Sequence, residues 1–322
     1  MLDQPLRLKP VLKQYLWGGR RLGTVLGKPL GDGDHFAESW EVVDHGTDQS
    51  VVAEGPLAGK TLHELVTQCG EALFGRQYPL PQFPLLFKFL DAQQTLSVQV
   101  HPNDDQASRL TPPDLGKTEA WVVLAAEAGS KIYAGLQPGV DRETLERHRA
   151  SGTCDACLHQ FEPAPGDCIF LQAGTVHALG AGLLIAEIQQ SSNTTYRLFD
   201  WNRVDRDGKS RQLHITESLD TMDYARGPVG PQRPLPTDRP HVERLVECDK
   251  FVLDRWRIDD PQSCGGDGRF HILAVVEGQV TLAAKGQPLL LSRGSTVLLP
   301  AECPAVSLKP QVRAVLLDMY LP

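Results

Sequence analysis

Short hydrophobic runs, separated every few positions by glycine, proline or aspartate, recur along most of the chain. Four of these runs are rich in β-branched residues and end at residues that favour turns, which is the pattern of strands. They cover residues 97–101, 120–126, 168–172 and 183–188. Together with the 29 glycines and 24 prolines, they predict an all-β fold with many turns.

Helical patterns are fewer and shorter. In a capping box, the N-cap side chain and the side chain three positions later each bond the other's backbone. Thr61 and Glu64 have this spacing, and so do Asn103 and Gln106. The charged segment 141–150 has the composition of a surface helix. We therefore expect a few helical insertions among the strands.

The clearest boundary along the chain is the segment 227–240, which holds five prolines. Proline lacks a backbone N–H and is excluded from helix interiors and central strands. The segment therefore predicts a linker or an extended wrap. It separates a domain of residues 1–226 from a smaller domain of residues 241–322.

Two segments of similar pattern indicate an internal duplication. Residues 166–178 and 294–306 each contain a glycine, a four-residue hydrophobic run and an alanine at matching offsets. In this alignment Ala305 takes the position of His177. We therefore expect two related β-barrels, of which the second lacks a polar centre and is metal-free.

The strand predicted at 97–101 has one polar face. Because side chains alternate along a strand, Ser97, Gln99 and His101 point to one side and two valines point to the other. A solvent-facing edge strand explains this pattern, since serine and glutamine are usually exposed. The alternative is a buried metal ion bound by the imidazole and the amide oxygen.

Residues elsewhere in the chain favour the metal. Glu119 begins the strand after His101, beside Lys117, and His177 follows a glycine turn. Two imidazoles and one carboxylate suit either zinc with an open position or non-haem Fe(II). Further on, Arg197 follows a polar turn. Arginine is a natural partner of phosphate, although an ordinary surface arginine is the alternative.

Composition narrows the class of protein. The formal net charge of −8 argues against a nucleic-acid partner. No stretch approaches the ~18 apolar residues of a membrane span, and the N-terminus lacks the apolar core of a signal peptide, so we expect a cytoplasmic protein.

Seven cysteines do not suggest a disulfide framework. Cys154 and Cys157 lack a second pair, and we interpret them as incidental thiols. The segment around Gly116 is no P-loop, because Thr111 occupies the required glycine position.

Several of these segments resemble the type I mannose-6-phosphate isomerases, in particular the short bacterial form. The resemblance runs from about residue 8 to 215 and is carried by five motifs. The motifs are KPVLKQYLWGGRRLG, ESWEV, FPLLFKFLDAQQTLSVQVHPND, LGKTEAW and PGDCIFLQAGTVHALGAGLLIAEIQQSSNTTYRLFDWNR. The resemblance implies two cupin-type (jelly-roll) β-barrels, with a few helical insertions in the first.

The resemblance also implies a site, carried over motif by motif. It implies one zinc ion per chain, held by Gln99, His101, Glu119 and His177. It implies catalytic roles for Lys117, Glu187 and Arg197, and substrate binding by Lys88, Ser97 and Asn193. The implied reaction interconverts D-mannose 6-phosphate and D-fructose 6-phosphate through an enediol, in a monomer or weak homodimer.

Two positions depart from the family pattern. Gly116 stands where the larger forms have histidine, as expected of the short form. Asn193 stands where the family usually has aspartate, four residues before Arg197. An amide cannot act as a carboxylate base. Either Glu187 or a zinc-bound water moves the proton, or the enzyme is slow, or the substrate differs.

Two other functions stay open at this stage. An Fe(II) cupin dioxygenase would use the same two histidines and glutamate, but it would need neither Gln99 nor the set of lysines and arginine. A non-catalytic sugar-phosphate-binding cupin would keep the pocket without turnover, and Asn193 favours it.

Overall fold

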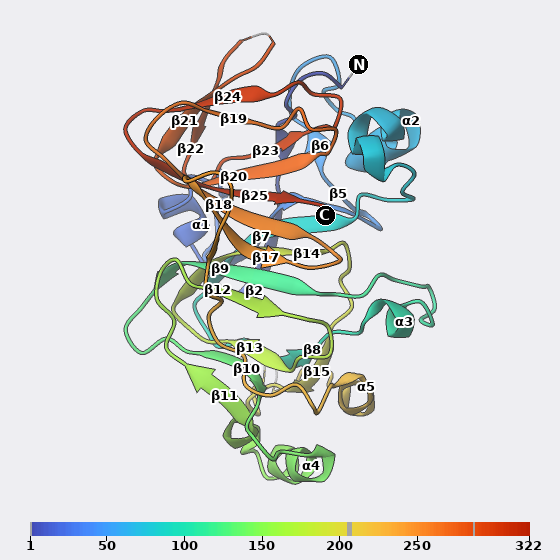
Figure 1. Ribbon diagram of the computed structural model, residues 1–322. Coiled ribbons are helices and arrows are strands. Elements are labelled where there is room, and N and C mark those ends of the chain that lie inside the picture. The colour runs from blue at the N-terminus through green and yellow to red at the C-terminus, as the bar shows by residue number, and fades with distance from the viewer. Residues whose placement is uncertain (1, 205–207, 286) are drawn as a thin grey trace. The chain divides into compact units, whose positions relative to one another are not determined.

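The computed structural model describes residues 2–204, 208–285 and 287–322. The described chain is mostly β-strand with few helices (Figure 1). It divides into two compact units. The central unit comprises Leu16–Gly19 and Leu90–Gln232, and the terminal unit comprises the chain up to Tyr15, Arg20–Phe89 and Arg233–Pro322. The division into domains 1–226 and 241–322 stays a prediction.

The central unit contains a five-stranded sheet and a row of three further antiparallel strands. The five-stranded sheet has the order β11-β10-β13-β8-β15. Its strands are β8 (Val98–Val100), β10 (Ile132–Leu136), β11 (Leu158–Phe161), β13 (His177–Leu179) and β15 (Tyr196–Phe199). The row has the order β12-β9-β14, with β9 (Glu119–Ala126), β12 (Cys168–Leu171) and β14 (Leu183–Gln190). All four strands predicted from the sequence are therefore present.

Two helices of the central unit lie where the sequence predicted them, and α3 (Asp104–Ala107) begins at the predicted cap, Asn103. Asn103 Oδ1 accepts from the N–H of Gln106 at 2.9 Å, and Gln106 Oε1 accepts from the N–H of Asn103 at 3.0 Å. Asp141 accepts from the N–H of Thr144 at 2.8 Å and so caps the charged surface helix. The helices are α3 (Asp104–Ala107), α4 (Arg142–Ala150), the 3-10 turn η2 (Cys154–Cys157) and α5 (Ile215–Thr221). Of these, α5 was not predicted.

The terminal unit contains a six-stranded sheet of order β16-β17-β18-β25-β20-β23 and a four-stranded sheet of order β19-β24-β21-β22. The first comprises β16 (Leu235–Pro236), β17 (Val242–Glu247), β18 (Val252–Ile258), β20 (His271–Glu277), β23 (Thr296–Leu299) and β25 (Ala314–Tyr320). The second comprises β19 (Gln262–Cys264), β21 (Gln279–Ala283), β22 (Leu289–Ser292) and β24 (Val306–Pro310). A buried apolar cluster that includes Trp256, Leu273 and Leu316 draws residues from both sheets.

The N-terminal part of the terminal unit adds short strands and one long helix. The strands are β1 (Leu8–Lys9), β2 (Val11–Gly19), β3 (Phe36–Val42), β4 (Asp44–His45), β5 (Asp48–Gln49), β6 (Val51–Val52) and β7 (Leu85–Ala92), of which β2 and β7 continue into the central unit. The helices are α1 (Arg21–Thr24), α2 (Leu62–Phe74) and the 3-10 turn η1 (Gly75–Gln77). The predicted capping box between Thr61 and Glu64 begins α2.

The proline-rich segment 227–240 is extended and bonded along its length. Val229 N donates to Ala134 O at 3.1 Å, within the central unit. In the terminal unit, β16 forms the edge of the six-stranded sheet and pairs Pro236 with Glu243. An edge strand tolerates proline because its outward N–H needs no partner. Of the two predicted forms, the extended wrap matches this geometry.

The internal duplication is visible locally but does not establish two barrels. Gly166 and Gly294 both have positive φ, at 94° and 85°, and each precedes a short buried strand, β12 or β23. Within the described residues, the sheets are open rows of strands. Closed cupin barrels therefore stay a prediction.

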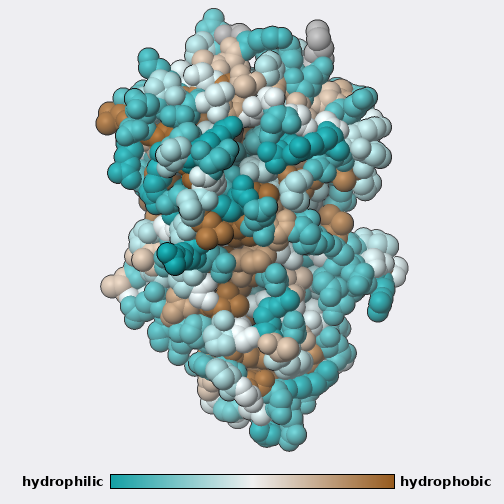
Figure 2. Space-filling view, viewed as in Figure 1, coloured by the Kyte–Doolittle hydropathy of each residue, from teal (hydrophilic) through white to brown (hydrophobic). Residues whose placement is uncertain are grey.

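Polar residues cover most of the face shown in Figure 2, where hydrophobic colour is confined to small areas. Large exposed hydrophobic side chains are scattered along the sequence, for example Tyr78, Leu235 and Val312. In the part of the chain that the structure describes, we find no helix of the length and hydrophobicity needed to span a membrane.

Candidate active site

The polar face predicted on residues 97–101 lies inside the central unit. Strand β8 runs between β13 and β15, where Gln99 is paired with His177 on one side and with Arg197 on the other. Ser97 and His101 are only 3% and 2% exposed. The interpretation of this strand as a solvent-facing edge is therefore wrong, because both of its backbone edges are paired.

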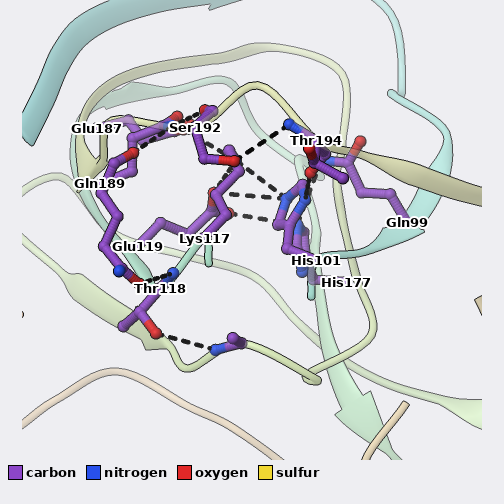
Figure 3. Close-up of polar contacts among 12 residues, drawn as sticks. Gln99, His101, Lys117, Thr118, Glu119, His177, Glu187, Gln189, Ser192 and Thr194 are labelled. Carbon is purple, nitrogen blue, oxygen red and sulfur yellow. Dashed lines mark hydrogen bonds and ion pairs between the residues drawn. The ribbon is translucent and has the colours of Figure 1, made fainter. Parts of the chain in front are cut away.

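Two histidines and one glutamate converge in this unit (Figure 3). Glu119 is the first residue of β9, and its Oε1 lies 3.3 Å from His177 Nε2. Its Oε2 lies 3.5 Å from His101 Nε2. All three side chains are at most 2% exposed, and one potential ligand atom of each lies within 4.8 Å of the others. The structure thus brings together three of the residues that the sequence analysis assigned to one metal site.

Backbone carbonyls fix how both imidazoles present their nitrogens. The Nδ1 of His101 bonds Thr194 O at 3.0 Å, and the Nδ1 of His177 bonds Thr175 O at 2.9 Å. With Nδ1 donating, each Nε2 is left as an acceptor that lies within 3.5 Å of a Glu119 oxygen. Burial, together with the charge of Lys117, lowers the pKa of His177 to about 4, which keeps this imidazole neutral.

A glycine turn sets the position of His177. Gly174 has φ +86°, and its N–H donates to His101 O at 2.8 Å. A Cβ at this position would be strained by the backbone conformation and would lie 3.3 Å from Asp223 Cβ. The turn before His177 is thus bonded to the backbone of His101, and the side chains of the two histidines meet in the cluster.

The Lys117 ammonium lies against the same nitrogen and oxygen atoms. Its Nζ is 3.0 Å from His101 Nε2, forms a short ion pair with Glu119, and lies 3.6 Å from Glu187 Oε1. A cation is therefore already stabilised where the neutral imidazole and the carboxylate converge. Gln99 adds an amide to the cluster, with its nitrogen 3.2 Å from His177 Nε2. Two imidazole nitrogens, a carboxylate and an amide form a donor set that fits a divalent metal.

Arg197 lies beside this cluster on β15. Its Nε donates to Ser97 Oγ at 3.2 Å, and its Nη1 donates to Gln212 O at 2.8 Å. Burial lowers the pKa of Arg197, but a guanidinium stays charged at neutral pH. Ser97 and Arg197 are thus brought together with the metal-binding candidates in one unit.

Three further residues that were singled out from the sequence are not part of this cluster. Lys88 belongs to the terminal unit, where its Nζ is 3.4 Å from Glu38 Oε2 and packs over the Trp40 ring. Asn193 is exposed on the loop between β14 and β15. At Gly116 a Cβ would lie 2.6 Å from Asp104 N, so this backbone leaves no room for a histidine.

Sequence reasoning missed two groups that support the site. Asp114 Oδ2 accepts from Ser192 Oγ at 2.8 Å and from Thr194 Oγ1 at 2.7 Å, which holds the loop that contacts His101. Gln189, paired with Glu119, donates its amide to Ser192 O at 2.6 Å. Its buried Oε1 has no partner among the described residues and so can accept from a ligand. The polar run after β14 was the only sequence signal for these contacts.

The structure describes all seven cysteines, and all are free thiols. Cys154 and Cys157 lie on η2, and both are buried. Burial raises the pKa of the Cys154 thiol to about 12, which keeps it protonated and unreactive. Their interpretation as incidental thiols fits this environment.

Comparison with known proteins decides the family. Residues 6–120 match the model for the phosphomannose isomerase type I catalytic domain, and residues 241–317 match the mannose-6-phosphate isomerase cupin domain. Mannose-6-phosphate isomerase ManA of Bacillus subtilis (strain 168) is 35% identical over 312 residues, which cover 93% of this chain and 94% of the relative. The chain belongs to the type I phosphomannose isomerase family.

Other family members give the same result. A mannose-6-phosphate isomerase of Streptococcus mutans is 33% identical over 299 residues, 93% of each chain. The crystal structure of mannose 6-phosphate isomerase from Bacillus subtilis superposes with a TM-score of 0.90 at 30% identity, covering 98% of this chain and 99% of that one. The apo form of the Salmonella typhimurium isomerase, at 18% identity and a TM-score of 0.79, shares the fold over 98% of this chain and 99% of its own. The roles of individual site residues stay predictions.

Proposed function

We propose that this chain interconverts D-mannose 6-phosphate and D-fructose 6-phosphate through an enediol, and that a zinc ion assists the reaction. The observation that supports this most is the buried cluster of His101, Glu119 and His177 in a member of the type I phosphomannose isomerase family. The dioxygenase alternative has no comparable support, because the curated relatives are named as isomerases.

The residues fit the proposed metal. His101, Glu119 and His177 would hold the ion, and Gln99 would join them once its amide turns its oxygen inward. Both imidazoles already present Nε2, since their Nδ1 atoms are bonded to backbone carbonyls. When bound, a divalent ion would stabilise negative charge that develops on the sugar oxygens at C1 and C2.

We assign proton transfer to Glu187. Isomerisation moves a proton between C1 and C2, and a carboxylate can carry it where an amide cannot. Glu187 is 3% exposed, and its Oε1 lies 3.6 Å from Lys117 Nζ, which ties it to the metal-binding cluster. The exposed Asn193 would then only position the sugar. Lys117 would stabilise the negative charges of Glu119 and Glu187, which lie on either side of its ammonium group.

The buried acceptor of Gln189 would recognise the sugar. Its amide nitrogen is fixed by two backbone carbonyls, at 3.0 Å from Gln190 O and 2.6 Å from Ser192 O. An unpaired buried oxygen is costly, so a hydroxyl of the substrate is a favourable partner. Arg197 and Ser97 would bind the phosphate, and substrate binding by Lys88 stays a prediction from the sequence.

Chelation tests the proposed function directly. Removing metal from the full chain should abolish conversion of mannose 6-phosphate to fructose 6-phosphate, and adding zinc should restore it. Restored turnover would also show that an aspartate at position 193 is dispensable. A folded, zinc-loaded chain that binds mannose 6-phosphate without converting it would instead support the non-catalytic sugar-phosphate-binding alternative.

Replacing Arg197 tests phosphate binding. In Arg197→Met, the KM for mannose 6-phosphate should rise about 100-fold, because a charge-assisted contact to a dianion is lost. Inorganic phosphate should stop competing with the substrate. Arg147→Met, on the exposed face of α4, serves as the matched control and should leave KM unchanged. An unchanged KM in Arg197→Met would contradict the assignment.

The remaining proposals concern organisation. We propose that both units are built on cupin-type barrels, that the protein is cytoplasmic, and that it is a monomer or weak homodimer. Light scattering of the purified protein at several concentrations checks the last of these.

A further inference from the structure

The terminal unit holds a second cluster of metal-binding side chains. Cys264 on β19, His271 at the start of β20 and Asp318 on β25 are 1%, 5% and 1% exposed. One ligand atom of each lies within 4.8 Å of the others. As in the central unit, the residues come from two different sheets. None of the three is at position 305, where alanine was the basis for expecting a metal-free domain.

The distances within this cluster are close to those of ligands that share one ion. Asp318 Oδ1 lies 2.8 Å from His271 Nδ1, and Asp318 Oδ2 lies 3.8 Å from Cys264 Sγ. Tetrahedral zinc, with Zn–S of about 2.3 Å and Zn–O and Zn–N of about 2.0 Å, separates its ligands by roughly 3.3–3.6 Å. For these two pairs, side-chain shifts of about half an ångström would therefore suffice, and the third pair, Cys264 and His271, lies within 4.8 Å.

The other nitrogen of His271 has the partner that a metal-bound histidine usually has. Its Nε2 lies 3.2 Å from Asp267 Oδ1. Arg269 fixes that carboxylate through two bonds to Asp267 Oδ2, at 2.6 and 2.8 Å. Histidines that bind metals commonly donate their second ring N–H to a carboxylate, which orients the ring and makes it a better ligand.

A cavity of about 230 Å³ lies in front of the cluster. Cys264, His271 and Asp318 are all in its lining, together with Trp256 and Arg239. The cavity provides an entry path and room for a fourth ligand. A site with three protein ligands and one open position is the arrangement that zinc adopts where it also binds an exchangeable molecule.

We propose that Cys264, His271 and Asp318 bind a divalent metal ion of the zinc class, and that Asp267 positions His271. A thiolate and an imidazole are preferred ligands of zinc, and the thiolate with the carboxylate neutralises its two positive charges. This site is separate from the proposed catalytic metal, and the proposal does not depend on the isomerase activity.

Cobalt(II) distinguishes the two sites. The His101, Glu119 and His177 cluster offers only nitrogen and oxygen donors, whereas Cys264 offers sulfur. The metal-stripped full chain titrated with Co²⁺ should therefore develop a near-ultraviolet thiolate-to-cobalt charge-transfer band that saturates by two equivalents, with the intensity of one cobalt thiolate per chain. Zinc should displace it. Cys264→Ser should lose the band and keep its isomerase activity.

Matched variants keep the test decisive. Cys303→Ser changes another buried thiol of the same unit, and Cys157→Ser changes one of the central unit; both should retain the band. Asp267→Asn leaves all three ligands in place and should weaken Co²⁺ binding about 10- to 100-fold. A wild-type chain without the band, or a band that survives Cys264→Ser, would overturn the proposal. If Cys264→Ser fails to fold, an unchanged Co²⁺ affinity in Asp267→Asn would overturn it too.

Discussion

Glu119→Gln is expected to lose the proposed catalytic metal and about 1,000-fold or more in kcat/KM. Glu119 is the only carboxylate in the His101, Glu119 and His177 cluster, and its two oxygens lie 3.3 Å and 3.5 Å from the two imidazoles. An amide of the same shape keeps the packing but removes the negative charge that would offset the ion. Several kcal/mol of charge stabilisation then disappear from the transition state.

Metal content per chain and kcat/KM, measured on the same preparation, check this prediction. Glu143→Gln on the exposed surface of α4 is the matched control and should behave as wild type. Thermal unfolding shows whether the variant folds, since Lys117 loses its closest carboxylate partner. A folded Glu119→Gln chain with full metal content and full activity would exclude this glutamate from the metal site.

In Glu187→Gln, kcat should fall about 100- to 10,000-fold, the range that general acid–base catalysis supplies. Metal content should be unchanged, because Glu187 is not among the residues proposed to hold the ion and lies 3.6 Å from the Lys117 ammonium group. KM should change little, since the phosphate contacts are elsewhere. Exchange of the C1 and C2 hydrogens with deuterated solvent, followed by NMR, measures the proton-transfer step itself.

The control for this variant is Glu162→Gln, an exposed glutamate beyond β11. If Glu187→Gln keeps its kcat and its rate of hydrogen exchange, Glu187 does not move the proton, and a metal-bound water becomes the candidate for this step. Glu187 would then be reassigned to holding Lys117 in place.

Local features of this fold could be predicted because their physical causes are local. The capping box of Asn103 and Gln106 depends on residues three positions apart. The polar face of β8 follows from strand alternation, which placed Gln99 and His101 on one side. Glu119 and His177 were added because they are metal-binding residue types at the ends of other predicted strands. The motif resemblance then placed them in one site, since spacing alone does not reveal which distant strands lie side by side.

Other features could not be predicted, because they depend on contacts between distant parts of the chain. Leu6 pairs with Leu298 within the terminal unit, and no boundary signal at 227–240 indicates that the first residues join the last strands. The second cluster was missed for a related reason. Cys264 and Asp318 are far apart in the sequence. In the alignment of residues 166–178 with 294–306, the only metal ligand compared is His177.

The two carbonyls that orient the imidazoles of His101 and His177 belong to Thr194 and Thr175, and every amino acid carries a carbonyl. A deep mutational scan of single substitutions would therefore score these positions by their side chains and overlook what they do. Insertions or deletions of one residue in the loops 172–176 and 191–195 would rotate those carbonyls away. Such length variants should be far less tolerated than substitutions at the same positions, and homologous enzymes could exchange these residues freely while keeping the loop lengths fixed.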